Sequence, residues 1–193
     1  MARKKHEFRP DIERNDILGK ILLTKQQRQS VLRWLLFSMV CLAGLILQDV
    51  VMSRVSILGA TTDLVPCCIL AVCIMQGAES GCIFALSASL IYYFSGSAPG
   101  PYVIPLITAI AIVAAIFRQG YLRKGFSALL LCAAVGLLLY ELSIFGIGLF
   151  LGHTRLDRLV RFFLTTLWTL ATAPVLYPIL LSIGKIGGET WKE

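Results

Sequence analysis

Six apolar runs fill most of the chain between residues 34 and 183 and limit what it can fold into. A helix needs roughly 20 apolar residues to cross a bilayer, with about 17 as the lower limit. The first, fifth and sixth runs reach that length, whereas the other three need tilt, flanking loop residues or local thinning of the bilayer. The runs cover residues 34–52, 64–76, 81–94, 102–117, 126–151 and 159–183.

The short second and third runs decide the number of spans. Pro66 is expected to break the second run, and only QGAES separates that run from the third, which is typical of a tight helical hairpin. Two separate spans give six in all, and a re-entrant pair gives five. The composition, 57% apolar and 15% charged, is far from that of a soluble domain, where about a quarter of the residues are charged. We therefore predict an all-α membrane protein with six transmembrane helices.

The basic residues predict the orientation. Of the 18 Lys and Arg residues, nine lie in residues 1–33, three in 118–125 and two in 184–193. An excess of Lys and Arg marks the cytoplasmic side, so both termini are expected there. The outer loops then hold four basic residues, three of them in HTRLDRLVR, which is basic on the wrong side. Beside a hydrophobic span, the basic N-terminus fits anionic membrane lipid better than nucleic acid.

These patterns predict three parts of the chain. Residues 1–33 form a basic cytoplasmic extension, residues 34–185 a six-helix transmembrane domain and residues 186–193 a short cytoplasmic tail. Within the extension, four apolar residues share one helical face, with Asn15 or Asp16 able to cap the helix. They fit a short helix in the membrane interface or a solvated helix that leads into the first span. The four are Ile17, Leu18, Ile21 and Leu22.

The sequence shows no pattern of an enzyme. The six cysteines lie in apolar runs without a CxxC spacing, so we expect buried hydrophobic side chains rather than metal ligands or disulfides. His6 and His153 are far apart in sequence and are expected on opposite sides of the membrane. No nucleotide-binding, hydrolase or zinc-peptidase motif is present. We predict no catalytic, cofactor-binding or metal-binding residues.

Small residues recur at helical spacing in two runs. Gly81, Ala85 and Ser89 lie four residues apart in the third run, and Gly148 and Gly152 do so in the fifth. Such stripes let helices approach closely. They fit packing inside the bundle or a face that accepts a transmembrane helix of a partner.

A few polar residues lie inside the apolar runs. Gln48 and Asp49 lie near the outer end of the first run, and Glu141 follows Tyr140 in the fifth. A carboxylate in hydrocarbon costs about 2.5–3.5 kcal/mol on insertion scales, so it marks a candidate functional site. Glu141 fits a structural hydrogen bond, to Gln48 or to a tyrosine of the third run, as well as it fits a site.

The chain resembles the MreD family of rod shape-determining proteins in segments that follow one another from Leu47 to Leu180. The segments are LQDVVMSRVSILGATTDLVPCCIL, QGAESG, SGSAPGPY, LLLYELSIF and LATAPVLYPIL. The matching pieces are Leu47-Gln48, Thr62-Asp63-Leu64, the pair Gly77 and Gly81, the turn Ser95-Gly96 to Pro99-Gly100, Tyr140-Glu141, and Ala173-Pro174 with Tyr177.

Three features depart from the family pattern. Thr62 replaces a proline before the aspartate, and Tyr92 and Tyr93 replace an acidic residue before the Ser-Gly turn. The basic N-terminal extension is the third departure, because the family usually begins almost at the first span.

The resemblance implies a non-enzymatic subunit of the bacterial cell-elongation machinery in the cytoplasmic membrane. The family acts with the single-span protein MreC, and the pair links MreB filaments to the peptidoglycan synthase RodA and its class B penicillin-binding partner. Its fold is similar to that of the six-helix substrate-binding subunits of energy-coupling-factor vitamin transporters. Glu141 is then expected to be a buried polar tie beside the groove for a partner helix.

The alternative function is that of such a transporter subunit. Those subunits share an A-x-x-x-A pattern on the first span, which docks the coupling subunit. Here Ala43 is followed four residues later by Leu47, so the pattern is missing. This difference favours the interaction protein over the transporter subunit.

Overall fold

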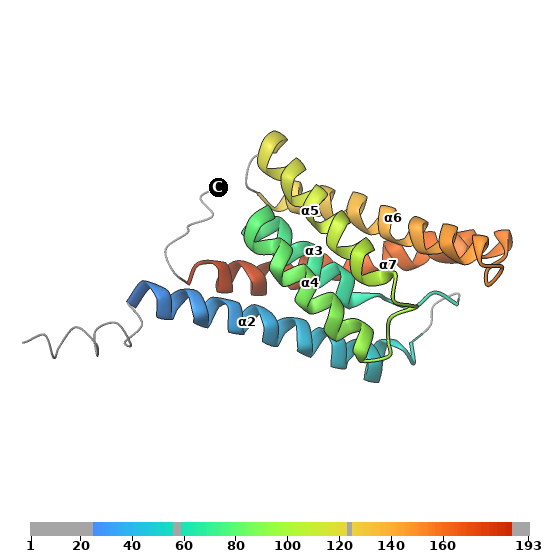
Figure 1. Ribbon diagram of the computed structural model, residues 1–193, viewed down its shortest axis with the longest axis horizontal. Helices are drawn as coiled ribbons and strands as arrows, with labels where there is room; N and C mark the ends of the chain where they lie inside the picture. Colours follow the sequence, from blue (N-terminus) through green and yellow to red (C-terminus); the bar gives the residue numbers. More distant parts are fainter. Residues whose placement is uncertain (1–24, 56–58, 123–124, 187–193) are drawn as a thin grey trace, which may run out of the picture.

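The computed structural model describes residues 25–55, 59–122 and 125–186, and the regular elements in these ranges are helical (Figure 1). The first helix, α2, continues without a break into the π-helical turn η1. A short 3₁₀ turn, η2, leads directly into the last helix. The elements are α2 (Lys25–Leu47), η1 (Gln48–Met52), α3 (Leu64–Gln76), α4 (Ala78–Phe94), α5 (Val103–Tyr121), α6 (Phe126–Phe150), η2 (Leu156–Arg158) and α7 (Leu159–Gly184).

Four helical segments are long and apolar enough to cross a bilayer, so the chain is that of a membrane protein. They are Gln27–Met52, Val103–Tyr121, Phe126–Phe150 and Leu156–Gly184. The other two helices, α3 and α4, are apolar but shorter. The boundaries predicted for the last four runs fall within a few residues of the observed helices.

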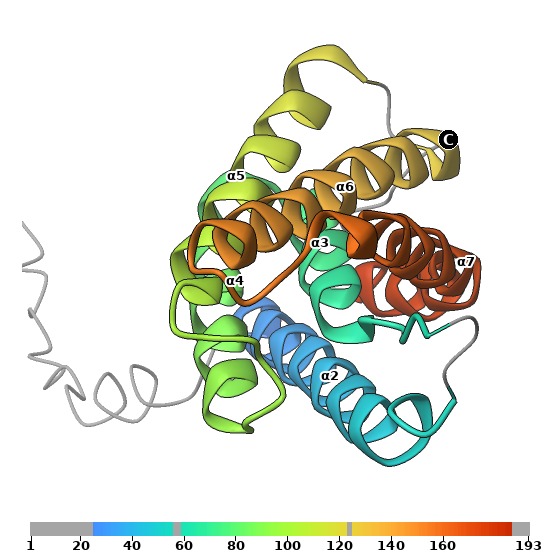
Figure 2. The same ribbon diagram turned by 90° about the vertical axis from the view of Figure 1, so that its right-hand side faces the viewer.

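The centre of the bundle is α3, which contacts α2, α4, α5, α6 and α7 (Figure 2). Every residue from Leu64 to Met75 is buried. A helix covered by protein on all sides need not match the thickness of the hydrocarbon, because its neighbours replace the lipid around it. This explains how a 13-residue helix can lie in the core of a membrane protein.

Pro66 does not break α3, contrary to the prediction. It lies in the first turn of the helix, where a backbone N–H has no partner within the helix. The loss of that donor therefore removes no helical hydrogen bond.

The stripe of small residues on α4 packs inside the bundle. A Cβ atom added to Gly81 would lie 3.0 Å from the Cα of Cys73, so α4 approaches the backbone of α3 closely. Ala85 and Ser89, further along the stripe, are 0% exposed. These residues are covered by the chain itself and offer no surface to a partner helix.

The second pair of glycines does not form a packing stripe, contrary to the prediction. Gly148 lies in α6, but its open side faces Thr154 of the loop that follows. Gly152 lies beyond the end of α6, with φ +72° and no atom within 4 Å of an added Cβ. It ends the helix in a left-handed turn, where glycine carries no steric penalty.

The helix that contains the first predicted span also includes residues before it, because the described residues from Lys25 to Arg33 are helical as well. No glycine or proline separates Lys25 from the apolar run, so the helix continues outward through polar residues. The predicted interfacial helix around Ile17–Leu22 lies outside the described residues.

Candidate functional site: a polar cluster and a cavity at one end of the bundle

The π-helical turn η1 sends two consecutive polar residues in different directions. Gln48 is 9% exposed and faces the bundle, whereas Asp49 is exposed. The Asp49 carboxylate accepts a hydrogen bond of 2.7 Å from the hydroxyl of Ser97, in the turn between α4 and α5. Single π-helical turns are common at functional sites, and this one joins the end of the first helix to the Ser95–Gly100 turn.

Asp63, directly before α3, is the centre of the polar contacts. Its Oδ1 accepts hydrogen bonds from the Gln48 amide at 2.7 Å and from the Tyr92 hydroxyl at 2.9 Å. Its backbone N–H donates to the Thr169 hydroxyl of α7 at 3.0 Å. The Gln48 carbonyl accepts the N–H of Val65 at 2.9 Å. We call Gln48, Asp63, Tyr92 and Thr169 the Asp63 cluster.

This cluster completes the N-terminus of α3. The first N–H groups of a helix have no partner within the helix, and this helix end has no side-chain cap of its own. Gln48 supplies the missing acceptor from the first helix. The Asp63 carboxylate also lies at the positive end of the helix dipole, which favours an anion there.

The Asp63 carboxyl group is partly withdrawn from water. Burial raises its pKa to about 6, although the hydrogen bonds from Tyr92 and Gln48 lower it. The hydrogen bonds from Tyr92 and Gln48 therefore favour the ionised form, and burial favours the neutral one.

Tyr140 and Glu141 of α6 lie next to this cluster but are not tied into it. Tyr140 is 0% exposed, and its hydroxyl faces that of Tyr92 without a hydrogen bond of ordinary geometry. Glu141 is 6% exposed, and its carboxylate makes no hydrogen bond to any residue that the structure describes. The hydrogen bond to Gln48 or to a tyrosine of α4, one of the two alternatives for Glu141, is therefore not formed, because the Gln48 amide and the Tyr92 hydroxyl donate to Asp63.

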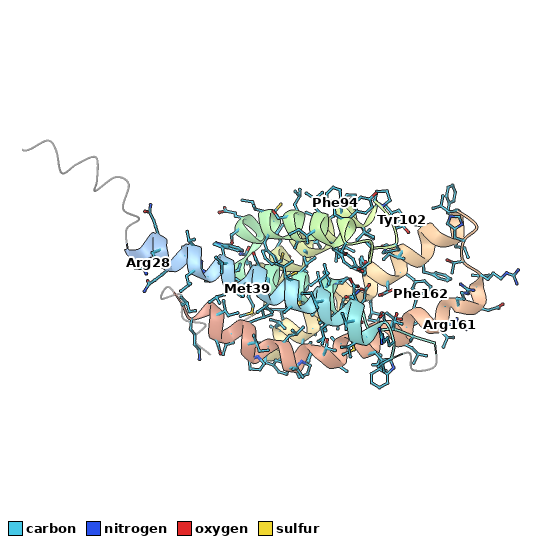
Figure 3. The ribbon with its side chains drawn as sticks, turned by 90° about the horizontal axis from the view of Figure 1, so that it is seen from below. Arg28, Met39, Phe94, Tyr102, Arg161 and Phe162 are labelled. Carbon is cyan, nitrogen blue, oxygen red and sulfur yellow. The ribbon has the colours of Figure 1, made fainter. Side chains whose placement is uncertain are left out.

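A cavity of about 700 Å³ opens beside these residues. Its walls come from η1, residues 59–63, the turn between α4 and α5, α6, the loop after α6 and the start of α7. Figure 3 shows Tyr102, Arg161 and Phe162, which line it, toward one end of the bundle and Arg28 at the other. The groups that decide its chemistry are Gln48, Asp63, Glu141, His153, Arg158 and Arg161.

The cavity offers hydrogen bonding and charge pairing. Two carboxylates, Asp63 and Glu141, lie on its buried side, and two exposed guanidinium groups, Arg158 and Arg161, lie at its rim. The two arginines make no ion pair with any described residue. Among the described residues, no three His, Cys, Asp or Glu side chains are placed to hold a metal ion together.

The structure brings together most of the polar residues singled out from the sequence. Gln48, Asp49 and Glu141 all line the cavity, whereas Tyr140 is fully buried and does not line it. The residue whose importance was missed is Asp63, which appeared only as part of the resemblance. The signal in the sequence was a carboxylate directly before a fully apolar run. A helix formed by such a run is buried from its first turn, so the carboxylate before it lies close to the core.

We expect Glu141→Leu to leave the fold intact and to raise the free energy of unfolding by about 1 kcal/mol, because it removes a buried carboxylate that has no hydrogen-bond partner. Thermal unfolding of protein washed free of lipid in detergent measures this change. Glu141→Gln, which keeps the shape of the side chain, serves as the control. A loss of several degrees in the unfolding temperature of the Leu variant would restore the structural role expected from the sequence.

In comparisons with known proteins, no protein-family model, no curated protein and no solved structure matches the chain.

Proposed function

We propose that this chain is a non-enzymatic membrane subunit of the bacterial cell-elongation complex. In this proposal it binds an MreC-like single-span protein in the cytoplasmic membrane and helps couple MreB filaments to peptidoglycan synthesis. RodA and its class B penicillin-binding protein are then direct or indirect partners.

The observation that supports this proposal is the convergence of the segments that resemble the MreD family. Gln48 and Asp63 come from the first of these segments and Glu141 from LLLYELSIF, far along the chain, yet all three line one cavity. The Ser-Gly turn joins them through the hydrogen bond from Ser97 to Asp49. Tyr92, which replaces an acidic residue of the family pattern, donates to Asp63.

The proposed topology has six crossings with both termini in the cytoplasm. Four helices have the length to cross on their own, and α3 and α4 complete the six as a hairpin. The distribution of basic residues supports this orientation, because Arg28 of α2 lies at the end of the bundle opposite to the cavity (Figure 3). The cavity then lies on the outer side.

Depletion of the protein in its own cell tests this function. We expect rod-shaped cells to widen or round and to grow poorly, because synthesis of the cylindrical wall would lose its membrane coupling. Light microscopy measures cell width, and an affinity-tagged chain should co-purify with the MreC-like protein. Expression of the wild-type chain from a second locus is the control. Unchanged cell shape together with an absence of the single-span partner would contradict the proposal.

One observation favours the second candidate, a substrate-binding subunit of a vitamin transporter. The cavity of about 700 Å³ lies within the range of about 300–1,000 Å³ that is typical of small-molecule sites. This function predicts that depletion creates a requirement for a nutrient without a change of cell shape. It also predicts that a water-soluble vitamin stabilises the purified chain against heat.

A further inference from the structure

A shallow apolar groove between α6 and α7 adjoins the cavity. The groove is lined mainly by Leu and Phe side chains, and it shares Glu141 and Phe162 with the cavity. Both helices can cross a bilayer, and the groove residues Leu138, Leu142 and Phe163 are 40–54% exposed on their outer surface. A polar cavity and a surface suited to hydrocarbon therefore meet at Glu141.

The charges in the cavity are separated rather than paired. Glu141 is buried without a hydrogen-bond partner among the described residues, and Asp63 lies near it. Arg158 and Arg161, which also line the cavity, are exposed and make no ion pair with the described residues. The guanidinium carbon of Arg161 would be 3.4 Å from a Cβ on Gly59, so the group rests on the loop backbone and not on a carboxylate.

A mostly buried carboxyl group that has no hydrogen-bond partner in the protein is poorly satisfied, because burial removes much of its water and no donor replaces it. A ligand that brings a primary ammonium would supply up to three donors to Glu141 and Asp63. Free arginines at the rim are suited to a phosphate, which guanidinium groups bind through paired hydrogen bonds. One zwitterionic group, with an ammonium at its inner end and a phosphate at its outer end, would pair with both the carboxyl groups and the arginines.

We propose that the cavity is a binding site for the headgroup of a zwitterionic phospholipid with a primary amine, phosphatidylethanolamine. Glu141 and Asp63 receive the ammonium, Arg158 and Arg161 receive the phosphate, and an acyl chain lies in the groove between α6 and α7. This site also accounts for the basic segment HTRLDRLVR, because two of its three arginines face the cavity. The proposal does not depend on the function proposed above.

The test uses the full chain, purified and washed free of lipid in detergent, with lipid binding measured by titration in native mass spectrometry. The probes are phosphatidylethanolamine, phosphatidylcholine and phosphatidylglycerol with the same acyl chains, and soluble phosphoethanolamine. We expect phosphatidylethanolamine to bind about tenfold more tightly than the other two lipids, the size expected for one hydrogen bond to a charged group. Phosphoethanolamine alone should bind far more weakly, because it lacks the acyl chains.

Two variants and one matched control separate the contacts. Glu141→Gln should abolish the preference for phosphatidylethanolamine over phosphatidylglycerol. Arg161→Gln, on the exposed rim, should weaken the binding of both lipids by a similar factor. Arg155→Gln is the control, because Arg155 is an exposed arginine of the same loop that does not line the cavity.

Three results would overturn the assignment. The first is equal binding of the three lipids by the wild-type chain. The second is an unchanged preference in Glu141→Gln together with unchanged binding in Arg161→Gln. The third is binding of phosphoethanolamine as tight as that of the lipid, which would show a site for a soluble ligand.

Discussion

Replacement of Gln48 by leucine is expected to cost about 3 kcal/mol of the free energy of unfolding, because two buried groups lose their partners at once. The N–H of Val65 loses the Gln48 carbonyl at 2.9 Å, and the Asp63 carboxylate loses the Gln48 amide at 2.7 Å. Leucine fills a similar volume, so the loss reflects hydrogen bonding rather than a cavity. Thermal unfolding in detergent, followed by circular dichroism, should show a midpoint lowered by several degrees.

The neighbouring residue provides a matched control for this variant. Asp49 lies on the same π-helical turn, but it is exposed and its partner is the half-buried Ser97. Asp49→Ala should therefore change the free energy of unfolding by less than about 0.5 kcal/mol, as surface substitutions usually do. Equal unfolding midpoints for Gln48→Leu and the wild type would show that the Asp63 cluster does not hold the N-terminus of α3.

A second variant separates the two contacts of Gln48. In Asp63→Asn the carboxamide oxygen still accepts from Tyr92, and Gln48 still accepts the N–H of Val65. The expected cost is therefore smaller than that of Gln48→Leu. The comparison shows how much of the effect comes from the cap of α3 and how much from the charge of Asp63.

The helices were predictable from the sequence because each apolar run ends at a strong signal. Gly77 ends α3 with φ +95°, and the Pro and Gly residues of SGSAPGPY separate α4 from α5. The central position of α3 was not predicted. Its residues from Leu64 to Met75 are all apolar, without a polar side, which is the pattern of a helix buried on every face rather than of a short span.

The polar contacts were less predictable, because they depend on which helix ends meet in space. Gln48 and Glu141 were both recognised as polar groups in apolar surroundings, and hydrogen bonding between them was one expectation. The sequence does not show that Asp63 reaches the same place from the segment before α3 and takes the donors of Gln48 and Tyr92. Glu141 therefore has no hydrogen-bond donor among the described residues. Which carboxyl group the two donors reach depends on distances at the angstrom scale, which the residue pattern does not encode.

The hydrogen bonds of Asp63 also change how the segments that resemble the MreD family are interpreted. The pieces of the pattern around Gln48, Asp63 and the Ser-Gly turn form hydrogen bonds that hold helix ends together. Their first role is therefore structural. The groups left over for binding are Glu141 and the two arginines at the rim, and these lie on or beside α6 and α7 rather than on α3.

The second large effect is expected at Gly81, where valine should cost about 3 kcal/mol, the upper end of the cost of overpacking a core. An added Cβ would lie 3.0 Å from the Cα and 3.2 Å from the Cβ of Cys73. The nearest atom belongs to the backbone of α3, so no side chain can rotate away to make room. The variant must push α4 off the central helix, and its unfolding midpoint and folded yield in detergent should both fall.

Gly146→Val is the matched control, because Gly146 is also in a helix but has no atom within 4 Å of an added Cβ. Its side chain would point to the exposed surface of α6, so we expect a change of less than about 1 kcal/mol, set by helix propensity alone. A smaller loss for Gly81→Ala than for Gly81→Val would support the steric cause, since alanine adds only the first carbon atom. If Gly81→Val and Gly146→Val unfold at the same temperature, α4 does not pack against α3 at the distance described here.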